Sequence, residues 1–108
     1  MHIDIDGLRR ALARLGPDIT LERAGCGAVW VRPARGLKIF LGGSTWTSGS
    51  LAIDASCADL RGKVLALRIA RLLAQGWQSI LVAIGGSTVV FAGGRMIGRV
   101  PEAPDAHA

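Results

Sequence analysis

Hydrophobic residues recur at helical spacing near the start of the chain and again in its middle. Over residues 7–15 the apolar positions form one stripe opposite three arginines, which predicts an amphipathic helix. Asp6 suits the N-cap of this helix, because a carboxylate there accepts hydrogen bonds from the first free N–H groups. Gly16 and Pro17 predict that the helix ends at residue 15.

A second, longer helix is predicted at residues 58–75, where Gly76 ends it. Ser56 and Asp59 have the spacing of a capping box, which marks the start of the helix. Apolar side chains cover most of its circumference, so we expect it to be covered on more than one side. The narrow polar ridge that remains consists of Arg61, Arg68 and Arg71.

Alternating hydrophobic and polar residues between the two helices predict three antiparallel strands, at residues 19–24, 28–32 and 37–41. The next segment is a polar loop around Trp46, and residues 51–54 suit a short edge strand. A three-residue hairpin loop at residues 34–36 pairs Val31 with Ile39 and keeps the apolar side chains on one face. The other face then holds two cross-strand pairs, Trp30 with Phe40 and Arg32 with Lys38.

The C-terminal part is the most apolar region of the chain. It predicts a meander of strands at residues 79–84, 87–92 and 95–100, turned by glycine pairs. Both faces of this meander are apolar, whereas a solvated antiparallel sheet has polar residues on one side. We therefore expect other elements or another molecule to cover the second face, and a homodimer through this meander is one prediction. Residues 101–108 are expected to form a disordered tail.

The two halves of the chain repeat one order of elements. Residues 7–41 and 58–100 each begin with a helix and continue with short strands broken at glycines. We expect a single domain over residues 1–100, because the chain is long enough for one hydrophobic core. The predicted fold is α+β with two layers: two αβββ-like units with antiparallel meanders, and one long helix packed on the sheet. The sequence leaves open whether the two units share one sheet and whether they arose by duplication.

The composition limits the class of protein. Half of the residues are hydrophobic and 19% are charged, which excludes disorder for most of the chain. The start lacks the pattern of a signal peptide, and the longest apolar stretch is far shorter than the roughly 20 residues of a membrane helix. We therefore expect a soluble, cytoplasmic protein that has no contact with a membrane. Cys26 and Cys57 fit a reducing compartment, with a disulfide between them as the alternative.

A net charge of +5 favours acidic partners, either nucleic acid or an acidic protein surface. The first candidate contact surface is the polar face of the N-terminal strands and the turn beside it, made of Trp30, Arg32, Arg35, Lys38 and Phe40. Aromatic and basic side chains on a sheet face can stack bases and hold phosphates. The structural alternative is that Trp30 and Phe40 form a cross-strand pair, while Glu22 balances Arg32.

The second candidate surface is the arginine ridge of the long helix, Arg61, Arg68 and Arg71, which could follow a phosphate backbone. The alternative is that these arginines are the solvated side of a buried helix. Trp46 is a further candidate contact in its loop.

The sequence offers little chemistry for catalysis. His2 and His107 stand at the two ends of the chain, so no histidine is placed as a base in the core. Asp54 and Asp59 are the closely spaced interior carboxylates near a loop, and Asp59 is already accounted for by the capping box. The repeated Gly-Gly-Ser-Thr segment suits turns better than phosphate-binding loops. We therefore expect no enzyme, no cofactor and no metal site.

Three functions remain after these exclusions. The leading hypothesis is a small basic binding protein that engages nucleic acid, or a complex of nucleic acid with protein, through its basic and aromatic surface. The alternative is a protein-binding inhibitor or adaptor, of the kind that phages and plasmids use against host defence, for example an anti-CRISPR. A small metal-dependent enzyme that uses Asp54, Asp59 and loop serines ranks last.

Overall fold

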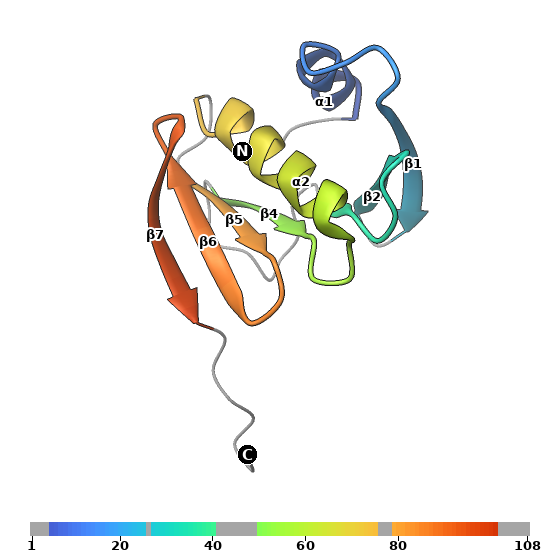
Figure 1. Cartoon of the computed structure of the whole chain (residues 1–108). Coiled ribbons are helices and arrows are strands. Elements are labelled where there is room, and N and C mark those ends of the chain that lie inside the picture. Colours follow the sequence, from blue (N-terminus) through green and yellow to red (C-terminus); the bar gives the residue numbers. More distant parts are fainter. Residues whose placement is uncertain (1–4, 26, 41–49, 76–78, 102–108) are drawn as a thin grey trace.

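The computed structural model describes residues 5–25, 27–40, 50–75 and 79–101 (Figure 1). In chain order its elements are α1 (Ile5–Leu12), β1 (Thr20–Gly25), β2 (Ala28–Arg32), β3 (Lys38–Phe40), β4 (Ser50–Asp54), α2 (Leu60–Leu73), β5 (Ser79–Ala83), β6 (Ser87–Ala92) and β7 (Arg95–Pro101). Trp46, Cys26 and the predicted tail lie outside the described residues, except that Pro101 ends β7.

The seven strands form one sheet, in which their spatial order is their chain order. Neighbouring strands are antiparallel except β4 and β5, which pair in parallel. A parallel pair needs a crossover connection, because the chain must return to the same end of the sheet, and α2 lies in that connection. The fold is therefore mixed α+β, and both meanders belong to one continuous sheet.

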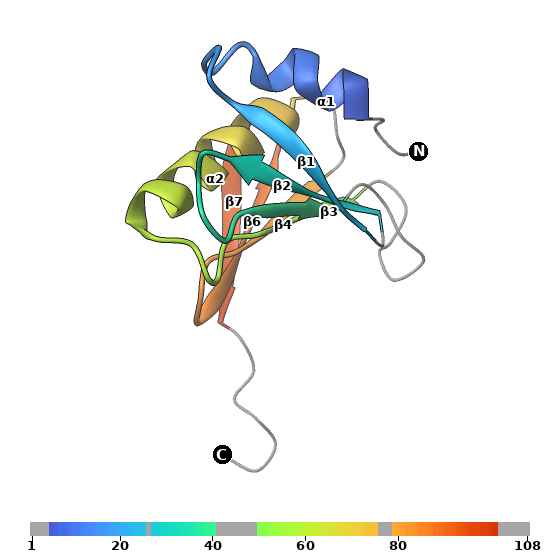
Figure 2. The same cartoon turned by 90° about the vertical axis from the view of Figure 1, so that its right-hand side faces the viewer.

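One face of this sheet and the two helices bury a common core. Strand side chains alternate between faces, and the set that includes Val31, Ile39 and Val82 is buried in one cluster with α2. The helix contributes its own buried stripe, Gly62, Ala66, Ile69, Ala70 and Leu73. α2 contacts β5 and β6, and α1 lies beside β1 and α2 (Figure 2). Within the described ranges, neither helix has both the length and the apolar character that crossing a membrane requires.

β4 was predicted as an edge strand, and this prediction is wrong. β4 lies in the middle of the sheet, between β3 and β5. Leu51, Ala52 and Ile53 are all buried, whichever face they occupy. A strand that is buried on both faces has a continuous apolar run rather than an alternating one, and this short run is such a case.

The predicted register of β2 and β3 is wrong by two residues. Trp30 pairs with Lys38, not with Phe40. The predicted register would place Pro33 opposite Leu37, but proline has no N–H to donate to the strand ladder, so pairing stops before it and Pro33 lies in the turn. Because the shift is an even number of residues, the prediction of which side chains share a face is confirmed.

α2 is also shorter than the predicted helix at residues 58–75, with 14 residues. Its N-cap is Asp59, whose Oδ1 accepts a hydrogen bond from the Gly62 backbone N–H at 2.8 Å. Ser56 takes no part in this cap, because its hydroxyl donates to Asp54 Oδ1 at 2.6 Å. The capping-box prediction therefore located the start of the helix to within a few residues but assigned the cap to the wrong side chain.

α1 lies closer to the start of the chain than predicted. Asp6, the predicted N-cap, is inside the helix and forms an ion pair with Arg9, with 3.2 Å between Oδ1 and Nη1. The helix ends at Leu12, and residues 13–15 form a turn rather than a further helical turn. Leu8 and Leu12 are fully buried, so the predicted apolar stripe does face the core.

Candidate binding surfaces

The first candidate surface lies on the face of the sheet that points away from α2. We name its four central residues the sheet cluster: Trp30, Arg32, Lys38 and Phe40. The ammonium nitrogen of Lys38 lies 4.6 Å from the Trp30 ring centre and 5.6 Å from the Phe40 ring centre. The guanidinium of Arg32 lies 5.7 Å from the Trp30 ring centre. At these distances both cations are attracted to the negative faces of the rings.

The cations of the sheet cluster have acidic neighbours within the same sheet. Arg32 Nε lies 3.2 Å from Glu22 Oε2, which is the pairing that the structural alternative predicted. Lys38 stands directly opposite Asp54 across the β3–β4 pair, on the same face. The cluster is therefore close to electrically balanced, and its rings already have cationic partners within the chain.

An apolar hollow of about 390 Å³ continues from the sheet cluster toward β6 on the same face. Its lining includes Phe40, Ala52, Asp54, Leu81, Ala83 and Thr88. Asp54 Oδ1 accepts hydrogen bonds from the backbone N–H and the hydroxyl of Ser56, at 3.0 and 2.6 Å. These bonds fix the carboxylate at the end of β4, and they give it a structural role there.

Arg35 does not lie on the strand face with the sheet cluster. It is exposed in the turn between β2 and β3, and this turn packs against the segment that leads into α2. A Cβ built on Gly36 would lie 2.7 Å from the Cys57 carbonyl oxygen, and a Cβ on Gly62 would lie 3.7 Å from that of Ala34. The turn that carries Arg35 therefore lies beside the beginning of α2, a contact that the sequence did not predict.

The second candidate surface is the outer side of α2. Five exposed residues at helical spacing form it, and we name them the α2 stripe: Leu60, Arg61, Val64, Arg68 and Arg71. The sequence predicted the arginines of this stripe and also a cover over the apolar residues between them. The structure places Leu60 and Val64 in solvent instead, with 78% and 50% of their surface exposed.

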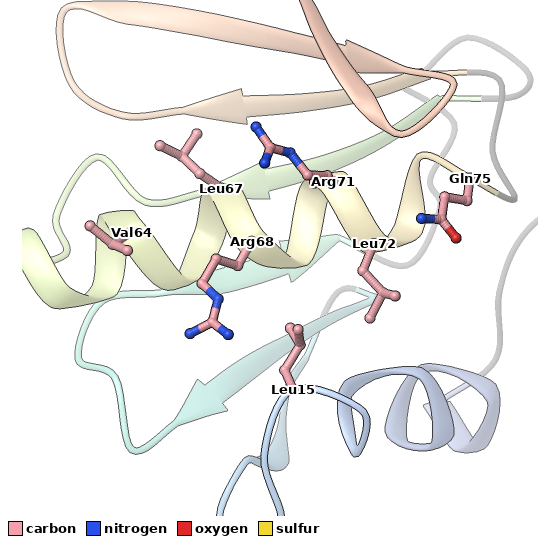
Figure 3. Close-up of a pocket in the computed structure, with 7 residues that line it drawn as sticks. All are labelled: Leu15, Val64, Leu67, Arg68, Arg71, Leu72 and Gln75. Atoms are coloured by element: carbon pink, nitrogen blue, oxygen red, sulfur yellow. The ribbon is translucent and has the colours of Figure 1, made fainter.

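A hollow of about 390 Å³ borders the α2 stripe (Figure 3). Arg68 and Leu72 point toward Leu15, which comes from the segment after α1, whereas Leu67 and Arg71 point toward the β6–β7 side. The lining is apolar except for the two arginines and Gln75. The hollow is thus a groove of leucine and valine side chains with a guanidinium on each side.

The charge of the α2 stripe is not neutralised within the described part of the chain. The ion pairs found there are Arg9 with Asp6 and Arg32 with Glu22, and neither involves α2. Asp59, the acidic residue closest in sequence, caps the N-terminus of α2 and forms no ion pair with these arginines. Three guanidinium groups on one side of a helix without an acidic partner favour an anionic contact from outside.

Seven of the sequence-predicted site residues thus fall on two separate surfaces, and Arg35 lies on neither. The sheet cluster and the α2 stripe lie on opposite sides of the sheet, because the side chains of the cluster alternate with those that are buried under α2. One ligand cannot contact both surfaces without wrapping around the domain. The exposure of Leu60 and Val64 was missed, although their spacing with Arg68 and Arg71 could have placed all of them on one stripe.

The described residues hold no group of three or more side chains of the histidine, cysteine, aspartate and glutamate type that could bind a metal ion. Cys57 is a free, exposed cysteine in these residues. No protein-family model matches the chain, and comparisons with curated proteins and with solved structures find no significant match.

Proposed function

We propose that this chain is a small, non-catalytic binding protein, an adaptor or inhibitor that docks an acidic protein surface on its α2 stripe. The observation that carries the proposal is the composition of that stripe. Leu60 and Val64 are largely exposed between arginines whose charges no acidic side chain of the described residues neutralises. Protein interfaces combine these features, because their buried centres are more apolar than the rest of the surface and arginine is enriched among the residues that supply most of the binding energy.

The mixture of side chains favours a protein partner over nucleic acid. A phosphate backbone would pair with the arginines, but it would leave Leu60 and Val64 beside charged phosphate groups and water. An acidic protein surface with apolar side chains between its carboxylates could cover both kinds of residue at once. The groove between α2 and Leu15 could receive one such apolar side chain, with Arg68 and Arg71 beside it.

Nucleic-acid binding, the leading hypothesis from the sequence, stays a prediction. The sheet cluster supports it less than expected, since Lys38 and Arg32 lie over the rings that would stack on bases. The homodimer through the C-terminal meander also stays a prediction. The cytoplasm is the compartment we propose, because the exposed thiol of Cys57 suits a reducing environment. For the fold, we propose that the helices form one layer and the sheet the other.

The test is retention of partners on the immobilised chain from a nuclease-treated extract of the cells that carry its gene. The Arg61→Glu/Arg68→Glu double variant should lose the retained protein, because both charges of the stripe are reversed. The control is Arg10→Glu/Arg23→Glu, which changes the net charge equally at exposed positions on α1 and β1. This control should retain the partner as the unmodified chain does.

Two results would contradict the proposal. In one, nuclease treatment abolishes all retention, which would identify nucleic acid as the contact. In the other, both double variants lose retention equally, which would mean that net charge alone, and not the α2 stripe, is recognised.

A further inference from the structure

β7 forms one edge of the sheet and is its longest strand among the described residues, from Arg95 to Pro101. It pairs with β6 on one side, and no strand of the described residues pairs with its other side (Figure 1). An edge strand presents a row of backbone donors and acceptors to solvent. None of the side chains of β7 is buried, so the strand is open to a partner along its whole length.

The side chains of β7 are a mixture of apolar and cationic groups. Met96, Ile97 and Val100 have 56%, 59% and 57% of their surface exposed. Arg95 and Arg99 are exposed on the same strand. Residues 79–101, which include all of β5, β6 and β7, contain no aspartate or glutamate. Carboxylates that would complement the two arginines must therefore come from another part of this chain or from a partner.

We propose that β7 is a docking edge for an extended, acidic peptide segment of a protein partner, which adds to the sheet as a further antiparallel or parallel strand. Main-chain hydrogen bonds to the free edge would supply affinity, and side chains on both faces would supply specificity. Charge complementarity selects the partner, since an acidic strand is attracted to Arg95 and Arg99 whereas a basic strand is repelled.

The register of β7 on β6 defines the sequence pattern that fits. Met96 and Arg99 pair with Phe91 and Val89, two buried residues, so they lie on the α2 side of the sheet. Arg95 and Val100 pair with Ala92 and Thr88 and lie on the other side. Ile97 lies at the shift in register and has no partner on β6, and apart from it each face of β7 offers one apolar and one cationic side chain. A matching segment carries one apolar and one acidic residue on each of its faces.

A second copy of the chain fits this edge poorly. If two β7 strands paired with each other, four arginines would meet in one ribbon, with no carboxylate in residues 79–101 of either copy. Like charges across a strand pair destabilise it. An acidic peptide avoids this repulsion, because its carboxylates would lie beside Arg95 and Arg99.

The probe is the fluorescein-labelled hexapeptide Val-Glu-Thr-Thr-Glu-Val, which carries one valine and one glutamate on each face of a strand, and its binding to the intact purified chain is followed by fluorescence anisotropy. Arg95→Glu/Arg99→Gln should weaken this binding by about tenfold or more, because two attractive contacts are lost and one becomes repulsive. Arg99 Nε also donates to Ser87 Oγ at 2.9 Å, so the single variant Arg95→Glu is measured beside the double variant, with circular dichroism as the check on folding.

Two matched controls separate strand addition from general attraction. Arg61→Glu/Arg68→Glu reverses charges on α2 and should leave peptide affinity within about twofold at physiological salt, because those charges are screened over roughly 8 Å. A peptide N-methylated at alternate residues keeps its charge but loses backbone donors, and it should bind at least about tenfold more weakly. The test needs no α2 partner, so its result is independent of the proposed function.

Three results would overturn the proposal. The N-methylated peptide could bind as well as the unmodified one. The α2 variant could lose the peptide as strongly as the β7 variants do. Finally, sedimentation could reveal a dimer of the unmodified chain that Arg95→Glu converts to a monomer, which would identify the occupant of β7 as a second copy.

Discussion

Gly36 lies where the turn between β2 and β3 meets the segment before α2. Its φ is +72°, in the left-handed region that favours glycine, and a Cβ there would lie 2.7 Å from the Cys57 carbonyl oxygen. The obstructing atoms belong to the backbone, so they cannot move aside as the end of a flexible side chain could. Gly36 thus allows the sheet turn and the start of α2 to approach each other closely.

Gly36→Ala should therefore lower the free energy of unfolding by roughly 3 kcal/mol, since it combines backbone strain with a steric clash. Gly86→Ala is the matched control: its φ is +77°, but a Cβ there would meet nothing within 4 Å. That variant should lose only the strain, about 1 kcal/mol. Urea unfolding of both variants measures the difference, and equal losses would disprove the close contact at Cys57.

The cation–π contact between Lys38 and Trp30 links two residues of the sheet cluster, and its energy can be measured. A double-mutant cycle of Lys38→Met and Trp30→Leu should give a coupling of about 0.5–1 kcal/mol, since Lys38 Nζ lies 4.6 Å from the Trp30 ring centre. Methionine keeps most of the alkyl chain and removes the charge. Thermal unfolding of the four proteins provides the coupling energy. A coupling near zero would mean that the ammonium group is free to contact a ligand.

At the scale of single residues, the sequence predicted the face of the sheet on which a side chain lies better than the residue that pairs with it across the strands. The alternation of polar and apolar residues placed Trp30 and Lys38 on the outer face correctly, because every strand side chain alternates. It could not choose between Phe40 and Lys38 as the partner of Trp30, since a shift of two residues leaves the faces unchanged. The missing N–H of Pro33 decides the register, and that signal was present in the sequence.

α2 is the element on which the proposed function depends. Its inner side is buried at Ile69, and its outer side exposes Leu60 and Val64 to solvent. If these two side chains contributed to stability, another element of the fold would pack over them. Their exposure is instead consistent with a contact surface, and this distinction can be measured without knowledge of the partner.

Leu60→Ser and Val64→Ser should each change the free energy of unfolding by no more than about 0.5 kcal/mol, as expected for surface substitutions. Ile69→Ala, on the buried side of the same helix, should cost about 2–5 kcal/mol through lost contacts and a cavity. Chemical denaturation of the three variants provides the comparison. A loss above about 1.5 kcal/mol for Val64→Ser would indicate that the outer side of α2 has a structural role.

At the scale of elements, the hydrophobic pattern predicted most strands near their observed positions. It failed for β4, where residues 51–54 were predicted to form an edge strand although they lie in the centre of the sheet. A run of three apolar residues contains no information about which strands lie beside it. For α2, the pattern predicted the arginine ridge, but periodicity alone cannot tell which apolar positions the sheet will reach.

At the scale of the whole molecule, the two sides of the sheet differ in whether their positive charges have acidic neighbours. Cations of the sheet cluster have acidic neighbours, Glu22 and Asp54, whereas the arginines of the α2 stripe form no ion pair with a described residue. The net charge of +5 gave no indication of this asymmetry, because it sums over residues without regard to their position. The crossover through α2 creates the asymmetry, since it places the longer helix on one face only.

Site-specific photo-cross-linking shows whether the α2 stripe docks a protein partner. A benzophenone amino acid replaces Val64 in the intact chain, which is expressed and irradiated in the cells that carry its gene. We expect a protein adduct that resists nuclease and disappears when Arg68→Glu is added. A nuclease-sensitive adduct, or a protein adduct that Arg68→Glu leaves unchanged, would contradict it.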